Sequence, residues 1–450
     1  MSKTKKTEIY DFAKQYAASG TVRLHMPGHK GVPLHGLEPL DLTEIQGADY
    51  LFESEGIIRR SEERMAELYG AAMTCYSTEG SSLSIKAMLA IAKRCAGGGR
   101  IKIAAGRNCH RAFLNALILL DIEPVWIWPK TPSTGICSSS LTPEDVAAAL
   151  DNDKDIAAVY ITSPDYTGRL ADVAGISRVC KARGVLLLVD NAHGAYLRFT
   201  EPCLHPLSLG ADICTDSAHK TLPCYTGASM LHISGQAPEG FAACAKAEMS
   251  LFASTSPSYL IMQSLDLCAG ELSEGLPEKI RACCERVAVL RRELSELGWT
   301  LTGDEPMKLC IEPREQGYTG NELADLLRES GIECEYSDPD CVVLMPSPCN
   351  SEEDLERLTE ALGAIPKGSP LPTDAVPTLT VPRRALLPRE AYFSPQRLIP
   401  AKDAEGLICG RSALSCQPSV PVVVSGEVFD KNVLAVLEYY GMEKVWVVEG

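Results

Sequence analysis

The chain has 450 residues, of which 45% are apolar and 23% charged, a balance typical of a globular protein with a large core. Its net charge of -16 disfavours nucleic acid and anionic membranes as partners and weakly favours a cationic ligand. No apolar run approaches the about 20 residues of a membrane span, and the N-terminus lacks the apolar core of a signal peptide. We therefore expect a cytoplasmic protein.

Helical and strand patterns alternate from about residue 61, after an N-terminal arm over 1–60 that has few regular patterns. Apolar runs rich in β-branched residues predict strands over 74–77, 101–105, 125–128, 157–162, 185–189 and 228–233. Amphipathic patterns predict helices over 61–69, 83–94, 111–120, 142–150 and 173–183. Continuous apolar strands separated by helices indicate a parallel or mixed sheet that is covered on both faces.

The second half of the chain predicts a smaller domain. A long helical region over 266–298, interrupted near Gly275 and Pro277, leads into it. The proline-rich segment 366–388 predicts an extended connection, and a further strand is expected over 420–424. The predicted domains are the arm 1–60, a large domain over 61–298 and a C-terminal domain over 299–450.

Eighteen cysteines are scattered along the chain without a C-x-x-C pair. The adjacent Cys283 and Cys284 do not suit a single tetrahedral metal site. Disulfides need an oxidising compartment, of which the sequence gives no sign. We predict free thiols that pack as small apolar side chains, and no metal site.

Lys220 lies in the segment ADICTDSAHKTL (211–222), directly after Ser-x-His and before a short run of small residues. A lysine in this setting is seldom a surface charge, and the pattern is typical of the lysine that holds pyridoxal 5'-phosphate (PLP) as a Schiff base. PLP also needs a carboxylate at its pyridine nitrogen, a group against the ring face and a phosphate-binding turn. Candidates for all three follow predicted strands, where ligands of parallel sheets bind.

Asp190 is the candidate carboxylate, because it ends the apolar strand over 185–189. A buried carboxylate needs a partner, and a protonated pyridine nitrogen is a suitable one. An aspartate that caps a helix or a turn is the alternative. Thirty residues separate Asp190 from Lys220, which leaves room for one further strand and a loop.

The candidate phosphate-binding turn is STEGSS (77–82), just before the helix over 83–94. Backbone N–H groups at a helix N-terminus bind phosphate, and the hydroxyls of Ser81 and Ser82 add donors. An ordinary N-cap serine is the alternative. Ser217, three residues before Lys220, offers one more hydroxyl.

Three histidines are candidates for contacts with the cofactor. His110 follows the strand over 101–105 and opens a helix, where its imidazole can stack on the pyridine ring. A helix-capping or solvent-facing histidine is the alternative. His193 is a further candidate, and His219 is placed to hold the phosphate or to move a proton.

Taken in order, these segments resemble the PLP-dependent Orn/Lys/Arg decarboxylases, which share the aspartate aminotransferase-like fold. The resemblance runs through most of the chain, and the chain looks like the short form of the family. It is carried by HMPGHKG (25–31), STEGSS (77–82), RNCHRAF (107–113), TSPDYTG (162–168), VDNAHGAY (189–196), DSAHKTL (216–222), STSPSYLIMQSLD (254–266) and LLPREAYFSP (386–395). The last two segments separate this family from general aminotransferases.

The resemblance implies an α/β fold, with a mixed, mostly parallel sheet in a large domain and a smaller C-terminal α/β domain. It makes Lys220 the Schiff-base lysine, places Asp190 at the ring nitrogen and stacks His110 on the ring. The phosphate would be held by Ser81, Ser82, Ser217 and His219.

The family builds its sites at a homodimer interface. The resemblance therefore implies that Ser254, Thr255 and Ser256 complete the phosphate site of the neighbouring subunit. The HMPGHKG arm is expected to act in a similar way.

The chain departs from the family pattern at three places, of which the last leaves the identity of the substrate open. Glu79 stands where the family often has Asn, and a carboxylate beside a phosphate is repulsive unless it points away. Tyr196 stands where the family often has His. The segment 415–427 differs from the family's Tyr-Pro-Pro-Gly-Ile-Pro and Pro-Gly-Glu, and in the family this segment shapes the substrate end of the site.

We therefore expect a decarboxylase of a basic amino acid, which is arginine, lysine or ornithine. The substrate amine displaces Lys220 from PLP, carbon dioxide leaves, and Lys220 or His219 returns a proton to Cα. Glu427 is a candidate partner for the distal cation of the substrate, and a solvated surface charge is the alternative. Polyamine supply and acid resistance both remain open as physiological roles.

Two other functions remain open. An aminotransferase or a lyase on the same fold would use an arginine for the α-carboxylate of its substrate. Candidates for this arginine are Arg383, Arg384, Arg389 and Arg397. A catalytically inactive protein that keeps the fold is the second alternative.

Overall fold

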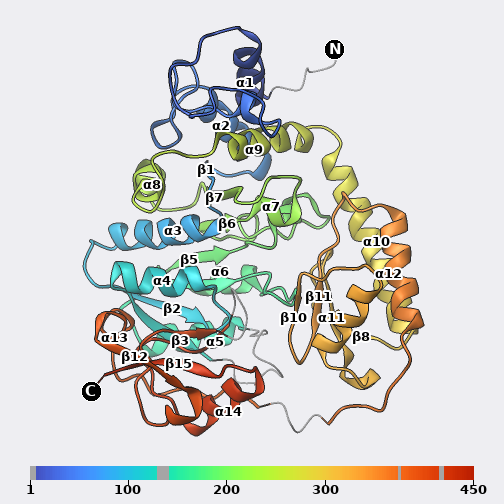
Figure 1. Ribbon diagram of the computed structural model, residues 1–450. Coiled ribbons are helices and arrows are strands. Elements are labelled where there is room, and N and C mark those ends of the chain that lie inside the picture. Colours follow the sequence, from blue (N-terminus) through green and yellow to red (C-terminus); the bar gives the residue numbers. More distant parts are fainter. Residues whose placement is uncertain (1–6, 129–140, 373–376, 415–419, 450) are drawn as a thin grey trace. The chain divides into compact units, whose positions relative to one another are not determined.

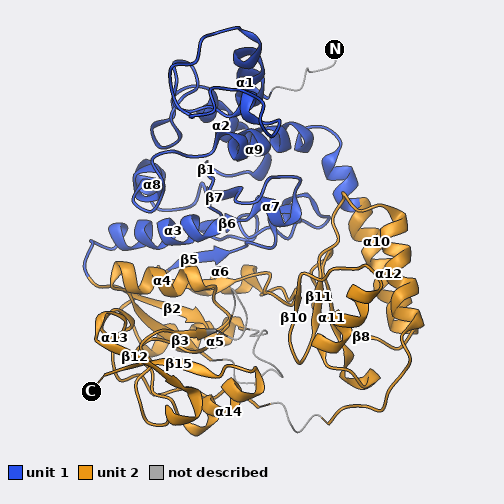
Figure 2. Ribbon diagram, viewed as in Figure 1, with its two compact units in different colours: residues 1–99, 186–281 blue, residues 100–185, 282–450 orange. Residues whose placement is uncertain are grey.

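The computed structural model describes residues 7–128, 141–372, 377–414 and 420–449 (Figure 1). The chain divides into two compact units, each built from two stretches of sequence (Figure 2). Unit 1 comprises residues 1–99 and 186–281, and unit 2 comprises residues 100–185 and 282–450. Each unit therefore combines one stretch from before residue 186 with one stretch from residue 186 onward.

Unit 1 contains four sheet strands in the order β1-β7-β6-β5. Strand β7 runs antiparallel to both of its neighbours, whereas β5 and β6 are parallel. The bounds of the strands are β1 Met73–Ser77, β5 Leu186–Asp190, β6 Ile213–Asp216 and β7 Ser229–Ile233. Strands β6 and β7 are buried along their whole length, because their side chains on both faces are covered.

Within the described residues, six α-helices lie wholly in unit 1. They are α1 Glu8–Ala18, α2 Ile57–Tyr69, α3 Ser81–Cys95, α7 Ala218–Thr221, α8 Phe241–Ser250 and α9 Tyr259–Leu272. Helix α3 packs against β6, β7 and α8. Helix α10, Leu276–Glu296, passes from unit 1 into unit 2.

Unit 2 begins with three parallel strands in the order β4-β2-β3. These strands are β2 Lys102–Gly106, β3 Glu123–Ile127 and β4 Ile156–Thr162. The helices between and after them are α4 Arg111–Leu120, α5 Pro143–Asn152 and α6 Val173–Lys181. This order of strand and helix is the one that a parallel sheet requires.

The rest of unit 2 holds smaller sheets. An antiparallel sheet in the order β10-β11-β9-β8 packs with α11 around an apolar core that includes Leu290, Leu323 and Leu358. Its elements are β8 Thr300–Thr302, β9 Leu309–Glu312, β10 Tyr336–Ser337, β11 Val342–Leu344, α11 Gly320–Glu329 and α12 Glu352–Ala364. The final segment forms α13 Pro388–Phe393, β12 Gln396–Pro400, β13 Ala413–Leu414, β14 Pro421–Val423, α14 Lys431–Tyr439 and β15 Lys444–Val448.

Each predicted strand and helix of the large domain is present, with ends that differ by a few residues. The helix predicted over 61–69 begins earlier, at Ile57, because Asp49 accepts hydrogen bonds from the backbone N–H groups of Gly56 and Ile58. The predicted interruption near Gly275 and Pro277 is also present, since α9 ends at Leu272 and α10 begins at Leu276. Pro277 fits the first turn of α10, where no N–H group is needed.

The arm over 1–60 is more regular than its sequence predicts, because it contains α1. Only Ile9 and Ala13 are buried on this helix, so its apolar stripe is short. Across the described residues, no helix combines the length and apolarity that crossing a membrane requires.

Candidate active site

Lys220 lies in the single turn of α7, just after β6. Its Nζ atom is 2.9 Å from Nε2 of His193, which lies in the loop after β5 and is buried. The parallel register of the two strands pairs Asp190 with Thr215. The loops that carry His193 and Lys220 therefore leave neighbouring parallel strands at their carboxyl ends, where ligands of such sheets bind.

Asp190 is the last residue of β5 and is 1% exposed. One of its carboxylate oxygens accepts the N–H group of Ala192 at 3.1 Å, which is a turn contact. The N–H group of Asn191 donates to the carbonyl of Thr215 at 2.9 Å and continues the ladder between β5 and β6. The structure thus places the Asp190 carboxyl group at the buried end of a strand, as the sequence predicts.

Several buried polar atoms in the same two loops have no hydrogen-bond partner within the described residues. These are Oγ of Ser217, Oγ1 of Thr221 and Oδ1 of Asn191. A buried polar atom without a partner costs roughly 1–3 kcal/mol, so native proteins seldom leave one unpaired without a functional reason. Three such atoms around the Lys220 segment indicate a polar ligand.

His219 is held in one orientation. Its Nδ1 atom is 2.8 Å from the carbonyl oxygen of Ala228, and its backbone N–H group donates to the same oxygen at 3.2 Å. A carbonyl oxygen can only accept, so Nδ1 carries a proton and donates. In the neutral ring Nε2 is then the acceptor, which suits a group that receives or relays a proton.

The predicted phosphate-binding turn opens α3. Gly80 is the N-cap residue with φ +67°, and Ser81, the first helical residue, is buried. The N–H group of Gly80 donates to the carbonyl of Gly227 at 2.8 Å. A Cβ atom at Gly227, which has φ +97°, would lie 2.9 Å from the carbonyl oxygen of Thr78. The segment that follows Lys220 is therefore held closely against this turn, and only glycine fits there.

Glu79 points toward another segment of unit 1. Its Oε1 atom accepts the backbone N–H group of Ser254 at 2.6 Å. Ser254, Thr255 and Ser256 are themselves exposed. The Glu79 carboxylate thus holds the segment that, by the family resemblance, is expected to complete the phosphate site of the neighbouring subunit.

In unit 2, His110 is the N-cap residue of α4. Its Nδ1 atom accepts the backbone N–H group of Ala112 at 3.0 Å. The capping alternative is therefore present in the structure, and it fixes the orientation of the half-buried ring. A neutral His110 then carries its proton on Nε2. Stacking of this ring on a cofactor stays a prediction.

Glu427 is buried, at 2% exposed, and is paired with Arg107, which is 3% exposed. The two carboxylate oxygens accept from Nη1 and Nη2 of Arg107 at 2.8 and 2.6 Å, and the N–H group of Val424 adds a third bond at 2.7 Å. Arg107 also lies over the rings of Trp126 and Trp128. Glu427 is thus not a solvated surface charge, and a role toward substrate would require it to share its carboxylate with Arg107.

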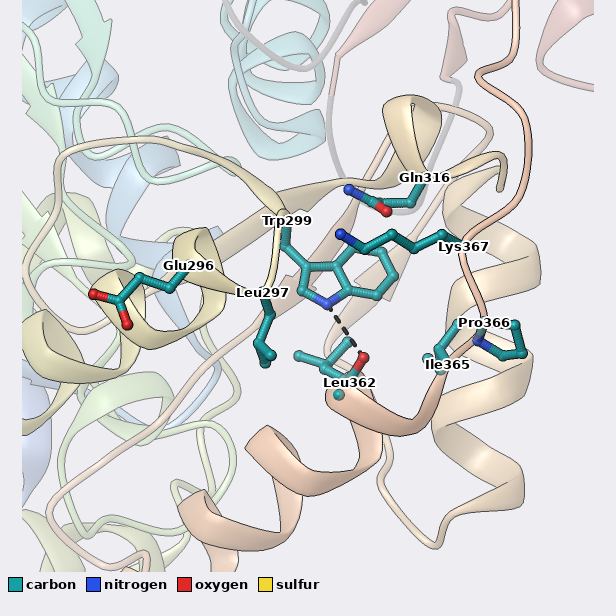
Figure 3. Close-up of a pocket in the computed structure, with 9 residues that line it drawn as sticks. Glu296, Leu297, Trp299, Gln316, Leu362, Ile365, Pro366 and Lys367 are labelled. Carbon is teal, nitrogen blue, oxygen red and sulfur yellow. Dashed lines mark hydrogen bonds between the residues drawn. The ribbon is translucent and has the colours of Figure 1, made fainter.

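Two cavities lie elsewhere in the described residues. One, of about 230 Å³ in unit 2, is lined by Trp299, Gln316 and Lys367, while Glu296 at its edge points away (Figure 3). The other, of about 630 Å³ in unit 1, has a mixed lining that includes Glu62, Arg59 and Lys246. None of the predicted site residues lines either cavity, so neither is assigned a role in the chemistry.

Comparison with known proteins identifies the family. The model for the major domain of Orn/Lys/Arg decarboxylases matches residues 7–308. This chain belongs to the Orn/Lys/Arg decarboxylase family. The family is one of carboxy-lyases, so the chain is an enzyme of that class.

Three relatives show how far the likeness extends. The arginine decarboxylase of Bacillus subtilis is 28% identical over 95% of this chain and 92% of its own length. The constitutive lysine decarboxylase of Escherichia coli is 29% identical over 58% of this chain and 38% of its own length. The crystal structure of the Francisella novicida lysine decarboxylase matches with a TM-score of 0.82 at 18% identity, over 99% of this chain and 82% of the other.

These comparisons confirm the predicted fold class, which is the α/β, aspartate aminotransferase-like fold with a smaller C-terminal domain. The predicted site residues in unit 1 are Ser81, Ser82, Asp190, His193, Ser217, His219, Lys220, Thr255 and Ser256. The predicted site residues in unit 2 are His110 and Glu427. Arg107 was not predicted, although its position directly after a strand was an available signal. Gly227 was also not predicted, and no signal for it is present in the sequence.

Proposed function

We propose that this protein is a PLP-dependent decarboxylase of a basic amino acid, with arginine as its substrate. In sequence, the likeness to the Bacillus subtilis arginine decarboxylase extends over 95% of the chain, whereas that to the Escherichia coli lysine decarboxylase extends over 58%. The chain's net charge of -16 is also favourable for attracting a cationic substrate. The amine that is released would serve polyamine synthesis.

The observation that carries the cofactor assignment is the contact between Lys220 and His193. An N···N hydrogen bond needs one donor and one acceptor, so this contact has two states. In one, the Lys220 ammonium donates to Nε2 of His193; in the other, Nε2–H of His193 donates to a neutral Lys220 amine. A neutral amine is the form that bonds to a carbonyl carbon. His193 is thus placed to hold and deprotonate Lys220.

The residues around Lys220 fit PLP. Ser217 offers a buried hydroxyl that lacks a partner within the described residues, and Ser81 lies at the N-terminus of α3, where phosphate binds well. Asp190 would keep the pyridine nitrogen protonated. When bound, PLP supplies an electron sink for cleavage of the bond between Cα and the carboxylate.

After carbon dioxide leaves, Cα requires a proton. His219 and Lys220 are adjacent in the chain, and the orientation of His219 is fixed by Ala228. We assign the return of the proton to one of these two side chains. The half-buried setting of both residues limits competition from bulk water.

We also propose a homodimer with shared sites. Apolar side chains of the arm are exposed at Val22 (78%), Leu24 (90%) and Leu34 (67%), more than a free surface of this kind usually carries. The exposed segment 254–256 would reach the site of the partner. A subunit interface that covers both segments would remove the arm's apolar side chains from water.

A cytoplasmic location is part of the proposal. The cysteines within the described residues are all free thiols, which suits a reducing compartment. Cys75 is fully buried and packs as an apolar side chain.

A substrate panel tests the function. Purified protein is incubated with arginine, lysine or ornithine labelled at the carboxyl carbon, and labelled carbon dioxide is collected. Release from arginine without a keto-acid acceptor is expected, and Lys220→Ala should abolish it. Lys402→Ala, which removes an exposed lysine, is the matched control. Absence of release with all three amino acids would refute the proposed activity.

A further inference from the structure

Unit 1 also contains a cluster of buried side chains that the decarboxylation chemistry does not use. His205, Asp216 and His232 are each 0% exposed, and their ligand atoms all lie within 4.8 Å of one another. Asp216 ends β6 and His232 lies in β7, whereas His205 belongs to the segment that precedes β6. Because these residues lie on separate segments, their spacing in the sequence showed no metal-binding pattern.

The strand register adds a fourth side chain to this cluster. The antiparallel pairing of β6 with β7 places Cys214 opposite His232. Cys214 and Asp216 are two residues apart on β6 and therefore share one face of the sheet. The Sγ atom of Cys214 is 3.9 Å from Nε2 of His205.

The distances between the ligand atoms of His205, Asp216 and His232 suit a shared ion. Oδ2 of Asp216 is 3.0 Å from Nε2 of His205 and 3.3 Å from Nε2 of His232. Neighbouring ligand atoms of a tetrahedral zinc ion, with bonds of about 2.0–2.3 Å, lie roughly 3.3–3.8 Å apart. Apart from its 3.3 Å contact with Asp216, Nε2 of His232 is buried without a partner among the described residues.

Surrounding groups hold the ligands in place, as the outer contacts of metal sites usually do. The side-chain amide of Asn191 donates to Oδ1 of Asp216 at 2.7 Å, which leaves Oδ2 to face the imidazoles. The hydroxyl of Thr74 is 2.8 Å from Nδ1 of His232, so Nδ1–H donating to it leaves Nε2 as a ligand. The ring of Tyr69 stacks on His232 with centroids 4.4 Å apart.

We propose that His205, Cys214, Asp216 and His232 bind one Zn²⁺ ion. Two neutral imidazoles, one carboxylate and one thiolate form a donor set that zinc prefers, and the two anionic ligands balance its charge. On binding, the Cys214 thiol releases its proton to solvent and forms a bond from sulfur to zinc. The site is closed by four protein ligands, so the ion is structural.

The ion would cross-link the loop of His205 to β6 and β7. Its ligand Asp216 lies only four residues before Lys220 in the sequence. The ion would thereby stabilise the strand end that positions Lys220. The competing arrangement has no metal, and a protonated imidazole then balances the buried Asp216 carboxylate.

Metal analysis of the wild-type protein decides between the two arrangements. Full-length protein without a polyhistidine tag is dialysed against a mild chelator, and its metals are measured by mass spectrometry. About one zinc per chain is expected, with one sulfur and three nitrogen or oxygen neighbours in the zinc X-ray absorption spectrum. Less than about a tenth of an equivalent, both as purified and after incubation with ZnCl₂, would overturn the proposal.

Variants locate the ion. Asp216→Asn should lower the zinc content at least about tenfold, and Cys214→Ser should remove the sulfur neighbour from the spectrum. His35→Gln, which changes an exposed histidine outside the cluster, should keep the zinc content of the wild type. If Asp216→Asn does not fold, Cys214→Ser and the wild-type spectrum still decide. Zinc that stays bound with an unchanged spectrum in Cys214→Ser would place the ion elsewhere and overturn the proposal.

Discussion

Each unit places a basic side chain just beyond a strand, and the two differ in how fully their surroundings are hydrogen-bonded. In unit 2, Arg107 follows β2 and binds both carboxylate oxygens of Glu427. It also donates to the carbonyls of Pro421 and Val422, at 3.1 and 3.3 Å. This guanidinium has no further need of a ligand.

In unit 1, Lys220 follows β6 and contacts His193, but its surroundings are incompletely paired. The hydroxyls of Ser217 and Thr221 are buried and have no hydrogen-bond partner in the parts of the chain that the structure describes. Leaving such groups unpaired is costly, and the cost is removed if a ligand supplies the partners.

The comparison teaches how to separate a structural cation from a functional one. Both follow strands, so their position in the sheet does not distinguish them, and Lys220 is half-buried where Arg107 is buried. The number of nearby buried polar groups that lack a hydrogen-bond partner among the described residues does distinguish the two side chains. On this criterion Arg107 with Glu427 stabilises the fold, and the Lys220 segment is the one that we propose to bind the cofactor.

The largest expected effect follows from removing the amine of Lys220. We expect Lys220→Ala to lower kcat/KM for arginine by at least about 10⁴-fold, because no other side chain replaces the covalent bond to the cofactor. Steady-state release of carbon dioxide measures this effect. Circular dichroism and the unfolding midpoint should match the wild type, and retention of more than a tenth of the activity would contradict the assignment.

The next effect concerns the Arg107 pair. Glu427→Ala leaves a buried guanidinium uncompensated, and we expect it to lower the free energy of unfolding by roughly 3–5 kcal/mol. Urea denaturation measures this loss. Glu405→Ala, which removes an exposed carboxylate in the same unit, is the control and should change stability by less than about 0.5 kcal/mol. An effect of Glu427→Ala on KM for arginine, with stability unchanged, would favour a role toward substrate instead.

Ser217→Ala should have two effects of opposite character. Loss of a hydroxyl that donates to a charged phosphate weakens PLP binding by about 1.5–3 kcal/mol, which is roughly 10- to 150-fold. The apo protein should be as stable as the wild type or slightly more stable, since an unpaired buried hydroxyl is removed. Titration with PLP and denaturation of the apo form measure the two.

Ser84→Ala is the matched control, because the Ser84 hydroxyl already has a partner in Ser229 at 3.3 Å. It should cost the apo form stability and leave the affinity for PLP unchanged. If Ser217→Ala destabilises the apo form while PLP binding stays the same, the Ser217 hydroxyl is structural.

The smallest effect is a change in the pH dependence of stability. Burial alone would raise the pKa of Asp49, but hydrogen bonds from the backbone N–H groups of Glu55, Tyr50 and Gly56 outweigh it and lower the pKa. A lowered pKa in the folded state contributes stability above the ordinary value of 3.8, and this contribution is lost as the pH falls through the folded value.

Asp49→Asn keeps the left-handed backbone at φ +70° accessible and removes the charge. Because Asp49 is partly exposed, we expect a loss of roughly 1 kcal/mol at pH 7 that shrinks as the pH approaches 3. Denaturation midpoints across this range measure it. A loss that does not change with pH would show that the carboxylate charge is not responsible.

The sequence predicts most of the sheet because its strands are short apolar runs bounded by polar turns. Strand β5 and its terminal Asp190 were predictable for that reason. Strand β6 was missed because only Ile213–Asp216 are extended and Asp212 and Asp216 interrupt the apolar pattern. Strands that are continuous apolar runs are thus predictable from the sequence, whereas a short buried strand bounded by charged residues is not.

Contacts between residues that lie far apart in the sequence were not predicted. The Arg107 pair joins residues 320 positions apart, and no local pattern records such a contact. The start of α4 at residue 111 was predicted, but the use of His110 as its cap was left open, because serine, threonine, asparagine and aspartate are the usual caps. Local sequence patterns therefore predict helices and strands, whereas contacts between distant residues can be identified only from the folded structure.

Reduction of the purified holoenzyme with sodium borohydride tests the central claim most directly. This reagent turns a Schiff base between a lysine and PLP into a stable secondary amine, which peptide mass spectrometry locates. We predict a phosphopyridoxyl group on the peptide that contains Lys220. An unmodified Lys220, or a modification on another lysine, would contradict the assignment of this segment as the cofactor site.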